Sequence, residues 1–129
     1  MAGMATWDDI RTIVAGLPET REASEHSWRV RDKAVAWERP LRKADREALG
    51  AAAPDGDILG VRVADVGVKE ALLADDPAVY FTTPHFTGYP AVLVRLAEID
   101  VDELHELLRD AWLAQAPKRL ARAYLDETG

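Results

Sequence analysis

The sequence predicts an α+β domain with an antiparallel sheet of about five strands and helices packed on one face. Apolar residues recur at helical spacing near both ends of the chain, whereas much of the middle alternates with period two or is β-branched. Segregation of strands from helices is typical of an antiparallel sheet covered on one side. A length of 129 residues, with 48% apolar and 30% charged types, indicates a single domain spanning residues 1–129.

Helices are predicted at both ends of the chain. The first covers Thr6 to Gly16, where Thr6 can cap the free backbone N–H groups and Pro18 prevents continuation. Asp100 can cap a helix that runs to about Ala116, and Pro117 suits the first turn of a last helix. Two shorter helices are expected at Leu41–Leu49 and Val66–Ala74.

A β-hairpin is the clearest strand signal. His26–Val30 and Ala34–Glu38 alternate in polarity on either side of Asp32-Lys33. Further strands are expected at Asp57–Val63, Val79–Thr82 and Ala91–Leu96. The polar segment Thr20–Glu25 is expected to be a connection.

The composition excludes several classes of site. The chain has no cysteine, so disulfides, thiolate metal ligands and cysteine nucleophiles are excluded, and we expect a reducing cytoplasm. No apolar run reaches the ~18 residues that span a bilayer, and the N-terminus lacks a signal-peptide pattern, so no membrane partner is expected. With 16 Lys and Arg against 23 Asp and Glu, the formal net charge is −7, and nucleic-acid binding therefore requires a local basic patch.

An ordered set of short motifs runs through the chain: Leu17-Pro18-Glu19, Trp28-Arg29-Val30-Arg31-Asp32-Lys33, Thr83-Pro84-His85, and Ala111-Trp112 near Ala116-Pro117. In this order and spacing, from about Trp7 to Tyr124, the sequence resembles the MmcQ/YjbR family of small bacterial proteins. Asp32 stands where that family usually has glycine. The resemblance implies a fold similar to CyaY, the bacterial frataxin, and DNA binding as the role.

A basic cluster is the first candidate site. Between Trp28 and Arg46, seven basic residues stand against three acidic ones, opposite in sign to the whole chain. The predicted nucleic-acid-binding residues are Arg29, Arg31, Lys33, Arg39 and Arg42. Arg29 and Arg31 are expected on one strand face with Lys33 at the hairpin tip, where they can hold phosphates with little sequence specificity. The alternative is a solvated face paired with carboxylates elsewhere.

A second basic cluster, Lys118, Arg119 and Arg122, opens the last predicted helix. We expect these side chains to pair with the carboxylates of Asp100–Asp110, unless an anion balances them.

The segment Thr82–Pro90 gathers hydroxyls, an imidazole and two aromatic rings between two strands. Its predicted ligand-binding residues are Thr83, His85 and Tyr89. A small-ligand- or protein-binding module that uses Thr83–Tyr89 is therefore the rival function. The alternative is a rigid loop in which Phe86 covers the edge of the core.

Metal binding and catalysis have little support in the sequence. The three histidines are far apart and show no metal-binding spacing. Acidic residues can form only a soft oxygen site, which keeps a metal chaperone as a third alternative; these are Asp8, Asp9, Asp100, Asp102, Glu103 and Glu106. No glycine-rich phosphate loop or nucleophile elbow is present, so we expect a non-enzymatic binding domain without metal ligands or a cofactor.

Overall fold

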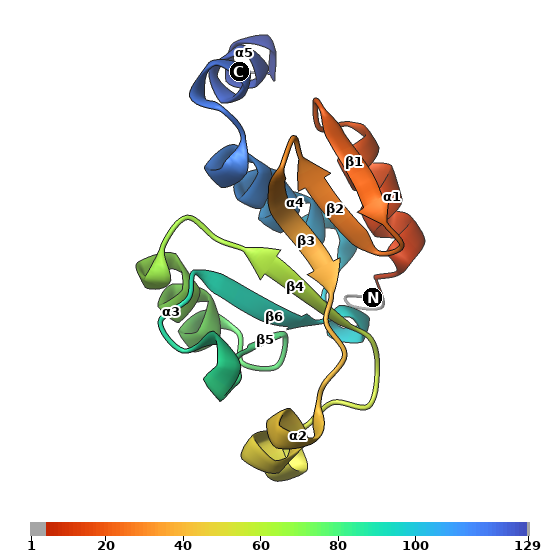
Figure 1. The fold of residues 1–129 in the computed structure, drawn as a ribbon, viewed down its shortest axis with the longest axis vertical. Helices are drawn as coiled ribbons and strands as arrows, with labels where there is room; N and C mark the ends of the chain where they lie inside the picture. Colours follow the sequence, from red (N-terminus) through yellow and green to blue (C-terminus); the bar gives the residue numbers. More distant parts are fainter. Residues whose placement is uncertain (1–4, 129) are drawn as a thin grey trace.

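The computed structural model describes residues 5–128 and shows a six-stranded antiparallel sheet with helices packed against it (Figure 1). The strands are β1 (Thr20–Ser24), β2 (Ser27–Val30), β3 (Lys33–Glu38), β4 (Ile58–Arg62), β5 (Tyr80–Phe81) and β6 (Ala91–Arg95), in the order β1-β2-β3-β4-β6-β5. The helices are α1 (Trp7–Ala15), α2 (Lys43–Leu49), α3 (Val66–Asp75), α4 (Val101–Gln115) and α5 (Lys118–Thr128). The α+β class predicted from the sequence is confirmed.

β1 is the strand that the sequence did not predict. The expectation of a connection at Thr20–Glu25 is wrong, because Thr20 pairs with Val30 and Glu22 pairs with Trp28 across an antiparallel ladder. β1 is an edge strand, and four of its five side chains are exposed. A strand that buries neither face shows no apolar alternation, so its sequence reads as a loop.

The main core lies between the sheet and the helices α1, α3 and α4. Its fully buried side chains come from both layers and include Ile10, Trp28, Val30, Leu59, Val61, Leu104, Leu108 and Trp112. Each buried leucine or isoleucine contributes about 1.5–3 kcal/mol through the hydrophobic effect. The Trp112 indole N–H also donates to the Pro18 carbonyl at 3.0 Å, which fixes the end of α4 to the segment after α1.

A second, smaller core lies on the opposite face of the sheet. Phe81, Phe86 and Leu93 are buried there, and Trp37 packs beside them. Gly60 on β4 leaves room for Trp37, since a Cβ atom at Gly60 would lie 2.6 Å from the indole. Loop 83–90 and α2 cover part of this face and shield that part from solvent.

No helix within residues 5–128 is long and apolar enough to cross a membrane.

Candidate nucleic-acid interface

The β2–β3 hairpin turns over only two residues, Arg31 and Asp32. Val30 pairs directly with Lys33, and Arg31 adopts a φ of 52° in the left-handed region. That conformation costs a non-glycine residue roughly 1–2 kcal/mol, so neighbouring contacts must hold it. Arg21 supplies one, because its guanidinium donates to the Arg31 carbonyl at 2.5 Å.

Two of the three predicted hairpin cations are engaged within the protein. The Arg29 guanidinium donates to the Asp32 carbonyl at 2.6 Å and so supports the turn. Arg31 Nε lies 2.8 Å from Glu19 Oε1, and this ion pair lowers the pKa of the Glu19 carboxyl. Lys33 is exposed and has no ion-pair partner among the residues that the structure describes.

The other two predicted nucleic-acid-binding residues lie at the far end of β3. Lys33 begins this strand and Arg39 follows its end, so about 20 Å separates them at the rise of an extended chain. Figure 1 shows the hairpin tip near α5 and α2 at the opposite end of the molecule. The structure therefore does not bring Arg39 and Arg42 together with Arg29, Arg31 and Lys33.

Arg39 is a buried structural residue. The residue is 7% exposed, its Nη2 lies 3.0 Å from Asp45 Oδ2, and its guanidinium lies 5.3 Å from the centre of the Phe86 ring. Burial acts to raise the pKa of Asp45, but the Arg42 backbone N–H and the Arg39 charge outweigh it and leave that pKa below its usual value. Removing either charge would leave the other buried without a partner, which is strongly destabilising.

The second basic cluster reaches the hairpin instead of the α4 carboxylates. α4 ends at Ala116, where the backbone becomes extended, and α5 begins after Pro117. Lys118, Arg119 and Arg122 form no ion pair with the described part of the chain, so the expected pairing with Asp100–Asp110 is not found. Instead, Lys118 and Arg122 line a groove that also contains Arg31 and Lys33.

This hairpin–α5 groove has a volume of about 880 Å³. Four of its lining residues are basic and two, Asp32 and Asp126, are acidic, so it carries a positive charge on a molecule of net charge −7. Val30, Leu113 and Leu125 add apolar surface. Gln115, at the end of α4, joins this helix to the hairpin, because its side-chain N–H donates to the Ala34 carbonyl at 2.9 Å.

Lys69, which sequence reasoning missed, anchors the backbone of loop 83–90. Lys69 is 4% exposed, and its Nζ donates to the carbonyls of Phe86 at 2.6 Å and Tyr89 at 3.1 Å. Burial lowers the pKa of this amine. A lone lysine in a helix looks like a solvated residue, so only the tertiary packing identifies this role.

The three predicted ligand-binding residues of this loop do not face one site. Thr83 is buried beneath the loop, whereas His85 and Tyr89 are exposed and line a shallow hollow of about 480 Å³. Phe86 is buried, as the rigid-loop alternative expected.

A comparison with protein families matches the YjbR model over residues 15–114. The chain belongs to the YjbR family. It is 65% identical over 129 residues to the uncharacterised proteins Rv2570 of Mycobacterium tuberculosis (strain ATCC 25618 / H37Rv) and Mb2600 of Mycobacterium bovis (strain ATCC BAA-935 / AF2122/97). These alignments cover 98% of this chain and 100% of each relative.

A solved structure shares the fold of this YjbR domain. It is the crystal structure of Deinococcus radiodurans protein DR2400, which contains a DUF419 domain. The TM-score is 0.60 at 22% identity, and the alignment covers 85% of this chain and 78% of that chain. At this identity the likeness shows the fold alone.

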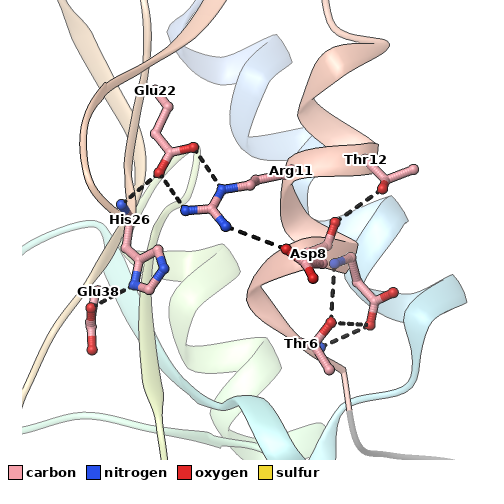
Figure 2. Close-up of polar contacts among 8 residues, drawn as sticks. Thr6, Asp8, Arg11, Thr12, Glu22, His26 and Glu38 are labelled. Atoms are coloured by element: carbon pink, nitrogen blue, oxygen red, sulfur yellow. Dashed lines mark hydrogen bonds and ion pairs between the residues drawn. The ribbon is translucent and has the colours of Figure 1, made fainter.

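Two further polar regions of the YjbR domain have structural explanations. In Figure 2, Glu22 accepts hydrogen bonds from Arg11 and from the His26 backbone N–H, while the His26 ring lies beside Glu38. The His26 ring also stacks on Trp7, with centroids 4.3 Å apart. These contacts join α1 to the β1–β2 turn.

The acidic residues of α4 line a groove of about 610 Å³ between α3 and α4. The groove contains six carboxylates: Asp75, Asp100, Asp102, Glu103, Glu106 and Asp110. Two of these carboxylates already make structural contacts within the protein. Asp100 caps α4, and Glu103 accepts a hydrogen bond from the Tyr80 hydroxyl. Among the described residues, no group of three or more His, Asp or Glu side chains could hold a metal ion.

Proposed function

We propose that this YjbR domain is a non-enzymatic binding domain that holds the phosphate backbone of DNA in the hairpin–α5 groove. One observation carries the proposal. Lys33, Lys118 and Arg122 come from two elements far apart in the sequence, line one groove, and have no carboxylate partner in the described chain. Cations gathered in this way repel one another, and a polyanion relieves the repulsion.

Arg31 is a fourth cation that can join the site. It lines the groove but is paired with Glu19, and both side chains are about half exposed. The Glu19 carboxylate neutralises this guanidinium in the wild type, so Arg31 adds to the phosphate contacts when Glu19 no longer holds it.

The groove favours weak binding with low sequence specificity. Its basic side chains can contact phosphates, whereas base reading in a duplex relies on amide and guanidinium groups placed against base edges. Gln115 is the amide in the groove, and its N–H is already donated to the Ala34 carbonyl. A cytoplasmic location and a fold related to that of CyaY remain predictions from the sequence.

The test is fluorescence anisotropy of a labelled DNA duplex at low salt. The groove variant is Lys33→Ala/Lys118→Ala/Arg122→Ala, and the matched control is Lys43→Ala/Arg46→Ala/Arg109→Ala, which removes the same charge from exposed positions outside the groove. We expect the control to bind like the wild type and the groove variant to lose at least tenfold in affinity. An equal loss in both variants would show that only overall charge matters, and the proposal would then fail.

Circular dichroism of each variant checks that it is folded, and gel analysis of the recovered duplex checks that the protein leaves DNA uncut. Cleavage that is lost in the groove variant would overturn the non-enzymatic part of the proposal.

A further inference from the structure

Two hollows meet at His85, on the face of the sheet opposite α1 and α4. The hollow of about 480 Å³ is lined by Trp37, His85, Phe86, Thr87, Gly88 and Tyr89. A smaller pocket of about 160 Å³ is lined by Arg39, Arg42, Ala44, Asp45, Pro84 and His85. One is therefore rich in aromatic rings, and the other contains two guanidinium groups.

The aromatic hollow offers ring surfaces in a fixed arrangement. Tyr89 is 44% exposed, and the Arg62 guanidinium lies 5.0 Å from the centre of its ring. The Arg62 side chain is itself anchored, because its Nε donates to the Pro90 carbonyl at 3.0 Å. Phe86 lies 6.3 Å from Tyr89, between centroids, and 4.9 Å from His85. Aromatic faces of this kind bind flat rings by stacking.

The buried amine of Lys69 makes this arrangement rigid. A buried lysine costs free energy unless its ammonium finds acceptors, and here the acceptors are two carbonyls of the loop itself. The loop is thus held in one conformation before any ligand arrives, and pre-organisation reduces the entropy lost on binding.

The smaller pocket has an excess of positive charge. Asp45 balances one guanidinium, that of Arg39, whose Nη2 is ion-paired but has no hydrogen-bond partner. Arg42 is exposed, and the structure shows no ion pair from its side chain to the residues that it describes. An anion that enters beside Pro84 can take hydrogen bonds from the exposed Arg42 guanidinium, and the buried Arg39 guanidinium adds positive charge behind it.

We infer that these two hollows form one site for a small ligand that joins a flat aromatic ring to a phosphate, as a nucleoside monophosphate does. The ring stacks in the hollow beside Trp37 and Tyr89, and the phosphate lies beside Arg42, with His85 at the junction. None of these residues lines the hairpin–α5 groove, so an experiment can refute this inference without refuting the proposed DNA binding, and the reverse also holds.

Isothermal titration of the full chain with three probes tests this inference: adenosine 5′-monophosphate, adenosine and inorganic phosphate. We expect the monophosphate to bind at least tenfold more tightly than either fragment, because it engages both hollows. Equal affinity for inorganic phosphate and the monophosphate would overturn the inference, as would no binding of the monophosphate at millimolar concentration.

Variants then separate the two halves of the site. Arg42→Ala should lower affinity for the monophosphate about tenfold while leaving that for adenosine unchanged. Tyr89→Ala should lower affinity for both about fivefold or more, the lower end of base–aromatic stacking. Arg46→Ala, at an exposed position of α2 outside the pocket, is the matched control and should bind like the wild type.

Backbone amide shifts from NMR locate the ligand. Shifts that saturate at residues 85–89 support the inference, whereas shifts confined to residues 31–33 would place the phosphate in the hairpin–α5 groove and overturn it.

Discussion

Glu19→Gln should strengthen DNA binding by releasing Arg31. The Glu19 carboxylate accepts hydrogen bonds from Arg31 Nε at 2.8 Å and from Arg31 Nη2 at 3.3 Å. Glutamine keeps the size of the side chain and removes its charge, so the guanidinium loses its ionic partner and becomes available to a phosphate. A loss of one negative charge on a net −7 molecule is a smaller, nonspecific effect that a control can measure.

The magnitude follows from the number of available cations. Each phosphate neutralised contributes about −0.9 to the slope of log affinity against log salt. Lys33, Lys118 and Arg122 therefore predict a slope of about −2.7, and the release of Arg31 predicts about −3.6. Between 50 and 200 mM salt, affinity should fall about 40-fold for the wild type and about 150-fold for Glu19→Gln.

Anisotropy titrations at four salt concentrations measure both slopes. Glu22→Gln is the matched control, because it also removes an exposed carboxylate paired with an arginine, Arg11, but outside the hairpin–α5 groove. Its slope should stay near −2.7, the value expected for three phosphate contacts of about −0.9 each. Identical slopes for wild type and Glu19→Gln would refute the reasoning, since Arg31 would then be bound to phosphate already or absent from the contact.

Two further predictions concern stability. Arg11, together with a backbone N–H, lowers the pKa of Glu22 from its ordinary value of 4.5 to about 2. The stabilisation from the ionised Glu22 is therefore present above pH 4.5 and is lost as the pH falls towards 2. The difference in melting temperature between wild type and Glu22→Gln should therefore shrink over this range; a constant difference would contradict the assignment. Gly60→Ala should destabilise the protein by about 1–3 kcal/mol in urea unfolding, because its Cβ meets the Trp37 indole, whereas Gly56→Ala, with open space around it, should cost much less.

The elements that bury an apolar face were predictable from the sequence. Ile10, Ile13 and Val14 recur at helical spacing, and the structure buries all three on α1. Trp28 and Val30 alternate with polar residues, and both are buried on β2. Periodicity of apolar residues indicates that one face of an element is buried, and each of these elements buries one face.

β1 lacked that signal for the same physical reason. Its stability comes from ladder hydrogen bonds to β2 and from polar contacts such as the Arg11–Glu22 ion pair. Backbone pairing leaves no mark on side-chain polarity, so an exposed edge strand is recognised only when its partner is in place.

The candidate site was harder to predict because residue type does not determine environment. Lys33 and Arg39 were equivalent cations in the sequence, yet one is exposed and the other is 7% exposed against Asp45 and Phe86. Phe86 is distant in the chain from Arg39, so no local pattern predicts this contact. Similarly, Lys118 reaches the hairpin only because the chain bends after Ala116.

The net charge of −7 hides a segregation of charge along α4. Carboxylates such as Asp102 line the groove against α3 near the start of this helix, whereas Gln115 at its end lies in the basic groove. At 1.5 Å per residue, about 20 Å separates these two positions, more than twice the Debye length of about 8 Å at physiological ionic strength. A phosphate in the hairpin–α5 groove is therefore screened from the carboxylates at the start of α4, such as Asp102, but lies within reach of Lys33 and Lys118. For this reason, an acidic composition does not argue against an anionic partner for this YjbR domain.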